Sequence, residues 1–210
     1  MRALKYFLVV IAIFTIYSFQ RSDEMNLLNR NYFILTGGPG GGKSTLIKVL
    51  RERGYLCMDE VARDIIKKEV TTNGDALPWA NKAEFTQKMF GETLKLYESV
   101  SSSDAIFFDR GVVDVLAYAK MVKVEISEEM LCTARKLAFN KKVFVTPPWE
   151  DIYRNDEERK QSFEEAIETF EHIVKEYQAY GYEIVVLPKT DVEDRINFML
   201  DLLNLPRFQK

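Results

Sequence analysis

The sequence is poor in cysteine and histidine and contains no long basic run. Its two cysteines, Cys57 and Cys132, are too few for a disulfide framework, and with a single histidine they leave no ligand set for a zinc cluster. The 29 basic and 32 acidic residues give a net charge of −3, which disfavours a dedicated nucleic-acid binder. This composition is that of an enzyme or a switch of a reducing compartment such as the cytoplasm, with no nucleic-acid partner.

The N-terminal region lacks both a full-length membrane span and a signal-peptide cleavage pattern. Tyr6–Phe19 is a nearly unbroken apolar run of 14 residues, whereas a membrane-spanning helix needs about 20. Three interpretations are open: an anchor, an uncleaved signal, or an upstream extension that the native protein lacks. We favour the third, because Met25 lies just before the first predicted strand. We therefore expect residues 1–24 to be an extension and residues 25–210 to be the domain, with a membrane partner only if the extension is native.

The remaining composition is that of one globular domain. Of the 210 residues, 47% are hydrophobic and 29% are charged, a balance that excludes a disordered or collagen-like chain. From Asn31 onward, predicted strands alternate with predicted helices. The strands are 32–36, 55–58, 105–108, 142–146 and 183–187, and the helices are 43–53, 60–70, 82–100, 113–122, 127–139, 157–180 and 192–203. This alternation predicts an α/β fold, with a five-stranded parallel sheet covered by helices on both faces.

The first predicted strand runs into Gly-Gly-Pro-Gly-Gly-Gly-Lys-Ser at residues 37–44, which fits the phosphate-binding P-loop pattern at every fixed position. In such a loop, glycines let backbone N–H groups turn toward phosphate oxygens. Lys43 would reach the β- and γ-phosphates, and the Ser44 hydroxyl would bind Mg²⁺. The alternative is a glycine-rich turn that binds nothing, but the flanking strand and helix favour the P-loop. The predicted nucleotide is ATP, with GTP as the alternative, and the predicted binding residues are Gly38, Pro39, Gly40, Gly41, Gly42, Lys43, Ser44 and Thr45.

The third predicted strand ends in Asp109 and Arg110. An acidic residue at this strand tip would lie beside the loop of the first strand, so Asp109 is a candidate for binding Mg²⁺ through water or for acting as general base. Arg110 is a candidate for holding the acceptor substrate or the transferring phosphoryl group. A surface turn with a local ion pair is the alternative.

Glu60 and Arg63 lie three residues apart where the second predicted helix begins. Residues at this spacing share one helix face, so the pair is suited to holding a polar acceptor such as sugar hydroxyls or a phosphate. An ordinary ion pair between the two is the competing interpretation.

Arg154 and Arg159 lie where the long predicted helix begins. Two arginines about one turn apart in this position would form a lid that neutralises charge during phosphoryl transfer. A charged helix start is an equally good interpretation.

Five segments together resemble one known family, the NadR-like AAA-type ATPase domains. They are the P-loop, the Glu-Val-Ala-Arg element at 60–63, Asp-Arg-Gly at 109–111, Thr-Pro-Pro-Trp at 146–149, and the Tyr-Arg-x-Asp-x-x-Arg spacing at 153–159. The resemblance covers about residues 31–203 and implies a kinase-like P-loop NTPase fold. It also implies that Lys43, Ser44 and Asp109 serve nucleotide and magnesium, and that Arg154 and Arg159 form the lid.

Two functions follow from these residues. The first is a kinase that uses Mg-ATP and a small-molecule acceptor held by Glu60, Arg63 and Arg110, with Lys43, Asp109, Arg110, Arg154 and Arg159 as catalytic residues. The second is a switch or adaptor that binds ATP or GTP and hydrolyses it slowly. A motor of the AAA+ class is disfavoured, because the third strand ends in Asp-Arg rather than Asp-Glu.

Overall fold

Five short hydrophobic segments pair side by side into one parallel sheet. The computed structural model describes residues 31–153 and 162–207. The strands are β1 (Tyr32–Gly37), β2 (Leu56–Met58), β3 (Ile106–Asp109), β4 (Lys142–Thr146) and β5 (Glu183–Val186). They are ordered β2-β3-β1-β4-β5, and every neighbouring pair is parallel. This sheet confirms the predicted α/β fold class.

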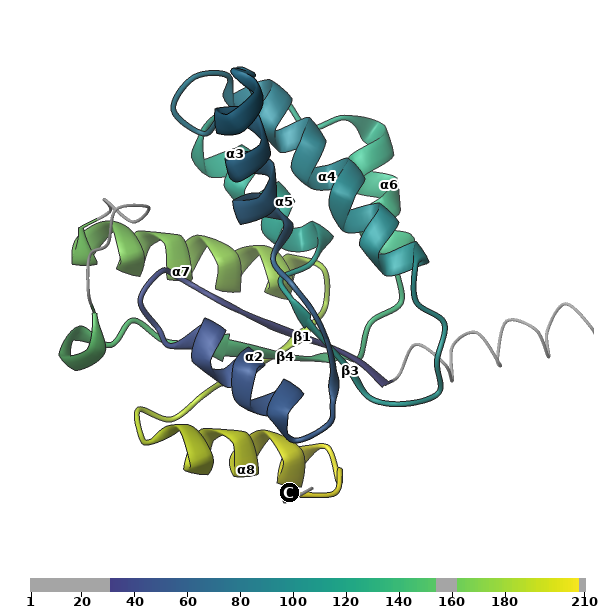
Figure 1. Cartoon of the computed structure of the whole chain (residues 1–210), viewed down its shortest axis with the longest axis vertical. Coiled ribbons are helices and arrows are strands. Elements are labelled where there is room, and N and C mark those ends of the chain that lie inside the picture. The colour runs from purple at the N-terminus through teal and green to yellow at the C-terminus, as the bar shows by residue number, and fades with distance from the viewer. Residues whose placement is uncertain (1–30, 154–161, 208–210) are drawn as a thin grey trace, which may run out of the picture.

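Helices cover both faces of the sheet (Figure 1). In chain order they are α2 (Lys43–Glu52), α3 (Val61–Thr72), α4 (Lys82–Glu98), α5 (Val112–Met121), α6 (Glu128–Lys136), α7 (Phe163–Ala179) and α8 (Val192–Leu202), with a short 3-10 turn η2 (Glu150–Ile152). Helices α2 and α8 lie against one face, and α7 lies against the other together with α5 and the group formed by α3, α4 and α6.

Each face of the sheet has its own hydrophobic core, because successive strand residues point to opposite faces. Phe33 and Leu35 of β1 pack with α2 and α8, whereas Ile34 packs with α4, α5, α6 and α7. All six residues of β1 are buried. Burial on both faces explains why residues 32–35 of β1 are apolar throughout rather than alternating.

One predicted helix start differs from the structure by more than one residue. The long helix α7 begins at Phe163 and not at Glu157, because Ser162 has an extended backbone and caps the helix, its Oγ accepting a hydrogen bond from the Glu165 N–H. The last helix begins at Val192 as predicted. Thr190 followed three residues later by Glu193 is a capping-box pattern that predicts Thr190 as the cap. The cap is instead Asp191, whose side chain accepts from the Asp194 N–H.

The part of the chain that the structure describes contains no helix long and apolar enough to cross a membrane. The apolar run Tyr6–Phe19 lies outside the described residues.

Candidate functional site

The glycine-rich loop joins the central strand β1 to α2 and packs closely against β4 and α7. Gly40 and Gly42 have φ angles of 79° and 82°, in the left-handed region that favours glycine. A Cβ on Gly41 would lie 2.6 Å from Oγ1 of Thr146, and a Cβ on Gly38 would lie 2.6 Å from the carbonyl oxygen of Ala166. The glycines therefore serve the backbone conformation of the loop and also its fit against neighbouring elements.

The loop leads directly into the N-terminus of α2. Gly42 is the N-cap residue, so no side chain caps the helix, and the first turn contains no acidic residue. The amide groups of that turn point along the helix axis toward the loop, where they favour an anion. Ser44 and Thr45 follow in the first turn and are exposed, whereas Lys43 is buried.

Lys43 lies between the two predicted carboxylates. Its Nζ pairs with Oδ1 of Asp109 and lies 3.6 Å from Oε2 of Glu60. Asp109 is the last residue of β3, directly beside Leu35 of β1. Glu60 is the N-cap residue of α3, just after β2. The carboxyl ends of three neighbouring strands thus bring these residues together, as is common for ligand sites in parallel sheets.

Arg110 follows Asp109, and its side chain binds the carboxylates of Glu60 and Asp114. Its φ angle is 74°, an uncommon value for a residue with a side chain. Its Nε donates to Oε1 of Glu60 at 2.7 Å, and one of its terminal nitrogens lies 3.3 Å from Oδ1 of Asp114. Asp114 was not among the predicted residues, yet it also accepts from the Thr36 hydroxyl, from the Gly111 N–H at 2.8 Å and from the Tyr177 hydroxyl at 2.5 Å.

These contacts and burial shift the pKa values of Glu60 and Asp109 in opposite directions. Burial raises the pKa of Glu60, but the positive charges of Arg110 and Lys43 outweigh burial and lower this pKa to about 2. Burial also raises the pKa of Asp109; Lys43 opposes this rise, and the negative charge of Glu60 adds to it. Burial lowers the pKa of Arg110, but Glu60 and Asp114 outweigh it and raise this pKa. Glu60 is therefore held ionised, whereas Asp109 is the carboxylate that takes up a proton more readily.

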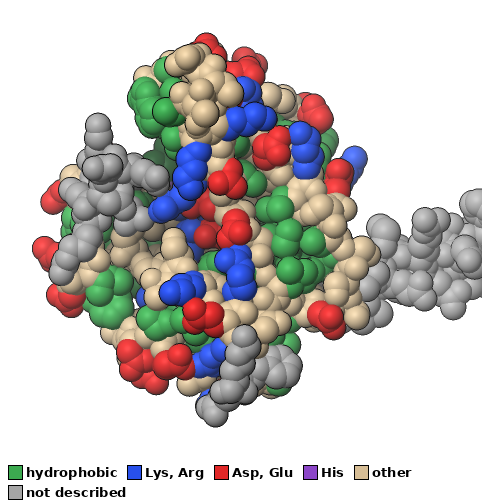
Figure 2. Space-filling view, in the orientation of Figure 1, with side chains coloured by type: hydrophobic (Ala, Val, Ile, Leu, Met, Phe, Trp, Pro, Cys, Tyr) green, Lys and Arg blue, Asp and Glu red, His purple; other side chains and the backbone are tan. Residues whose placement is uncertain are grey.

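A cleft of about 240 Å³ opens beside this cluster. Ser44, Asp109, Glu60 and Arg63 all line it, together with basic and acidic residues of α2 and α3. Figure 2 shows Lys and Arg side chains gathered with acidic ones between α3 and α2 on this face. Arg63 lies 4.0 Å from Oε2 of Glu60, so the ion pair that was the competing interpretation is present, and Arg63 also lines the cleft.

Mg²⁺ was predicted to bind through Ser44 and Asp109. Both residues line the cleft and offer oxygen atoms, which are the ligands that Mg²⁺ prefers, with phosphates and water filling its remaining positions. Within residues 31–153 and 162–207, no group of three or more His, Cys, Asp or Glu side chains is arranged to hold a metal. The donor set thus fits an ion that arrives with a nucleotide rather than one caged by the protein alone.

Arg195 of α8 was also missed by the sequence analysis. It is 2% exposed, and one of its terminal nitrogens donates to the carbonyl oxygen of Gly41 at 3.0 Å. Its guanidinium lies 5.8 Å from the ring of Trp149, and its buried Nε has no hydrogen-bond partner among the described residues. Burial lowers its pKa. Arg195 therefore binds the glycine-rich loop from the face of the sheet that α2 and α8 cover.

The two predicted lid arginines, Arg154 and Arg159, lie outside the described residues. The structure describes the segment before them, where the ring of Tyr153 would be 2.3 Å from a Cβ added to Gly40. The chain that leads into the predicted lid therefore passes directly over the glycine-rich loop.

Residues 32–195 match a family model described as an AAA domain, AAA_28. A comparison with curated proteins finds no match. Among solved structures, the NadR protein in complex with NR superposes with a TM-score of 0.64 at 18% identity, over 88% of this chain and 54% of that chain. The NadR protein in complex with NAD and AMP-PNP superposes with a TM-score of 0.61 at 16% identity, over 88% and 53%.

Shikimate kinase from Acinetobacter baumannii in complex with shikimate superposes with a TM-score of 0.51 at 15% identity, over 82% of this chain and 92% of that chain. These similarities show a shared fold. The chain spans about half the length of the NadR chains that it matches.

Proposed function

The chain belongs to the AAA_28 family of AAA domains, and we propose that it is a kinase that transfers the γ-phosphoryl group of ATP to a hydroxyl group of a small metabolite. The observation that carries the proposal is the meeting of Lys43, Asp109 and Glu60 at one cleft beside the glycine-rich loop. The fold shared with shikimate kinase and with NadR, which binds AMP-PNP, supports it.

Nucleotide binding would begin at the loop. The amide groups around Gly40 and at the start of α2 would receive the phosphate oxygens, and the positive end of α2 would favour their charge. Lys43 is held by Asp109 and Glu60. When a triphosphate arrives, Lys43 would exchange Asp109 for the β- and γ-phosphates, which leaves the Asp109 carboxylate free for the acceptor.

The acceptor would lie in the cleft between α2 and α3. Glu60, kept ionised by Arg110 and Lys43, would accept a hydrogen bond from an acceptor hydroxyl. Arg63 would bind an oxygen of the same molecule from α3. Asp114 fixes Arg110, which in turn fixes Glu60, so the acceptor would meet a preorganised surface.

In the transfer step, the acceptor oxygen bonds to the γ-phosphorus while the bond from the γ-phosphorus to the β–γ bridging oxygen breaks. The hydroxyl proton passes to Asp109, whose pKa is raised by burial, and ADP leaves. A magnesium ion bound through Ser44, and held by Asp109 only through water, would supply positive charge to the phosphates and leave the Asp109 carboxylate able to take the proton. Arg110, beside Asp109, and the lid residues Arg154 and Arg159 would stabilise charge on the transferring group.

The test measures ADP release by the full chain with Mg-ATP, and GDP release with Mg-GTP. The acceptors are nucleosides, nucleoside monophosphates, nicotinamide riboside and shikimate. We expect one acceptor class to stimulate release. Asp109→Asn should lower kcat by about 10²–10⁴-fold while retaining ATP binding, because it removes the proton acceptor. Lys43→Ala should weaken both binding and turnover.

The matched control is Asp104→Asn, because Asp104 is an exposed carboxylate at the opposite end of β3. It should leave kcat unchanged. Tight ATP or GTP binding with slow release that no acceptor stimulates would overturn the kinase proposal in favour of a switch or adaptor. Full activity of Asp109→Asn would remove the role assigned to Asp109.

A further inference from the structure

A second, larger pocket lies near the amino ends of β4 and β5, whereas the glycine-rich loop lies at the carboxyl end of β1. Its volume is about 800 Å³, within the size range of small-molecule sites. It is bordered by the C-terminal ends of α5, α6 and α7 and by the segments that enter β4 and β5. None of its lining residues lines the cleft proposed for catalysis.

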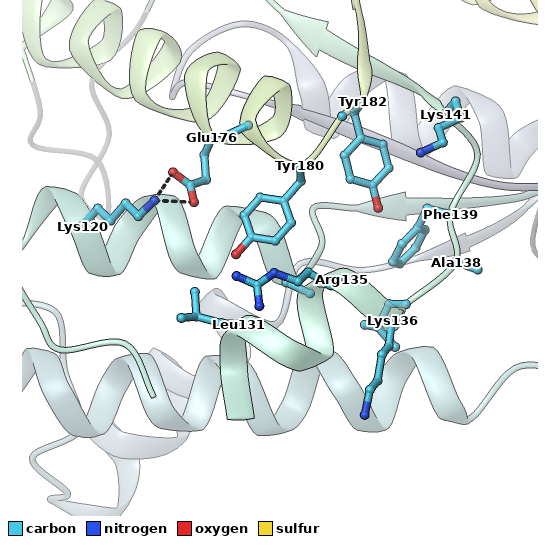
Figure 3. A pocket seen from close by; sticks show the side chains of 14 residues that line it. Lys120, Leu131, Arg135, Lys136, Ala138, Phe139, Lys141, Glu176, Tyr180 and Tyr182 are labelled. Carbon is cyan, nitrogen blue, oxygen red and sulfur yellow. Dashed lines mark hydrogen bonds and ion pairs between the residues drawn. The ribbon is translucent and has the colours of Figure 1, made fainter. Parts of the chain in front are cut away.

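Basic and aromatic side chains face one another across this pocket (Figure 3). Arg135 of α6 and Tyr180 after α7 point toward one another, and the Nζ of Lys141 lies 5.8 Å from the centre of the Tyr182 ring. Phe139 lies beside Tyr182, so part of the wall is apolar. Lys136 points away from the tyrosines and stands at the rim.

Not all of these charges are available to a ligand. Lys120 is bound by both carboxylate oxygens of Glu176 at 2.6 Å, so this pair is neutralised within the wall. Arg135 lies 3.8 Å from Glu128 on the solvent side, where an ion pair contributes little. Cations near the end of α6 also offset the partial negative charge of that helix terminus. Lys141 is in no helix and has no carboxylate partner among the described residues.

The tyrosine hydroxyls add hydrogen-bond donors to the same space. Within the described residues, neither the Tyr180 hydroxyl nor the Tyr182 hydroxyl makes a hydrogen bond, although both rings are half-buried. Burial raises the pKa of Tyr182 to about 12, so its hydroxyl keeps its proton and can donate at neutral pH. Two cations and two free donors around an aromatic wall match an anion that carries a planar ring.

We propose that this pocket, lined by Arg135, Lys141, Tyr180 and Tyr182, binds a small aromatic anion of the nucleoside monophosphate class. Arg135 and the Tyr180 hydroxyl, which point toward one another, would bind the phosphate, and the ring would pack against Phe139 and Tyr182 on the side of the pocket where Lys141 lies. The site is separate from the glycine-rich loop, and the proposal does not rest on kinase activity.

The test titrates AMP into the full chain by isothermal titration calorimetry. Adenosine supplies the ring without the charge, and inorganic phosphate supplies the charge without the ring. We expect AMP to bind and each of the two fragments to bind at least about tenfold more weakly, because each lacks one set of contacts. Equal affinity for phosphate and AMP would overturn the aromatic part, and no AMP binding at about 1 mM would overturn the site.

Two double variants test whether AMP binds in this pocket. The double variant Arg135→Gln with Lys141→Gln should weaken AMP binding about tenfold or more, because it removes both cations without adding a carboxylate at the end of α6. Tyr180→Phe with Tyr182→Phe should weaken it by removing the two donors alone. Thermal unfolding followed by circular dichroism checks that these variants fold.

Two controls separate this pocket from other sites. Lys68→Gln neutralises an exposed lysine of α3 that lines neither pocket, and it should leave AMP affinity unchanged. Lys43→Ala, which acts at the glycine-rich loop, should also leave AMP affinity unchanged. AMP binding that persists in the Arg135 and Lys141 double variant would place the ligand outside this pocket and refute the proposal, and its loss in Lys43→Ala would then place it at the loop.

Discussion

At the scale of single residues, Arg195 links the last helix to a loop 154 positions earlier in the sequence. Its hydrogen bond to the Gly41 carbonyl oxygen holds the loop in the conformation that would receive phosphate. Arg195→Met keeps the length and apolar contacts of the side chain but removes this bond. We expect ATP affinity to fall about fivefold, or about 1 kcal/mol, as measured by calorimetry.

Arg53→Met is the matched control for Arg195→Met. Arg53 follows α2 and pairs with Glu193 of α8, so it joins the same two helices without touching the glycine-rich loop. It should lower stability slightly and leave ATP affinity unchanged. Equal losses of ATP affinity in both variants would mean that packing of α2 against α8, and not the hydrogen bond to Gly41, determines the conformation of the glycine-rich loop.

Local sequence signals were sufficient for part of the site. The glycine pattern before Lys43 and the acidic residue at a strand end both depend on neighbours in the chain, and the structure places Lys43, Asp109 and Glu60 together. Asp114 and Arg195 gave no such signal, because their partners come from β1, α7 and the loop. A carboxylate four residues after Arg110 on a helix was the one available hint for Asp114.

At the scale of elements, the N-terminal part of α7 is fixed by its contact with the loop. A Cβ on Gly38 would meet the Ala166 carbonyl oxygen at 2.6 Å, and this backbone atom has no freedom to rotate away. Gly38→Ala should therefore push α7 from the loop and lower the free energy of unfolding by about 1–3 kcal/mol. Urea unfolding measures this change.

Gly91→Ala should have the opposite effect on stability from Gly38→Ala. Gly91 lies inside α4, and a Cβ there would meet no atom of the described residues within 4 Å. Alanine favours a helix over glycine, so this variant should raise stability by about 0.5–1 kcal/mol. If both variants changed stability by the same amount, the close approach of α7 to the loop would not explain the need for glycine at position 38.

The elements also show where sequence patterns lose precision. Strands and helices alternate as predicted, since apolar runs and amphipathic periods report burial directly. The start of α7 could not be located in the same way, because a charged segment before Ser162 is compatible with a helical first turn. The Ser162 and Glu165 capping box is a local signal that would have placed the start correctly.

At the scale of the whole molecule, stability in acid should depend on the charge cluster beneath the cleft. Arg110 and Lys43 outweigh burial and lower the pKa of Glu60 to about 2 in the folded chain, against about 4.3 in an unfolded chain. The unfolded state therefore takes up a proton on Glu60 first as the pH falls. The stabilisation from ionised Glu60 is complete above about pH 4.5 and is lost between there and about pH 2.

Glu60→Gln removes this contribution, so the free energy of unfolding should fall less steeply with acid in the variant than in the parent chain. The difference in slope should approach about 1.4 kcal/mol per pH unit, the value for one proton. Urea unfolding at pH 6, 4 and 3 measures it, with Glu98→Gln as a control that removes an exposed carboxylate of α4. Identical slopes for Glu60→Gln and the parent chain would show that Arg110 and Lys43 do not hold Glu60 in its ionised form. In that event, the preorganised acceptor surface proposed for the cleft would lose its electrostatic basis, because Glu60 would enter the site as an ordinary solvated carboxylate.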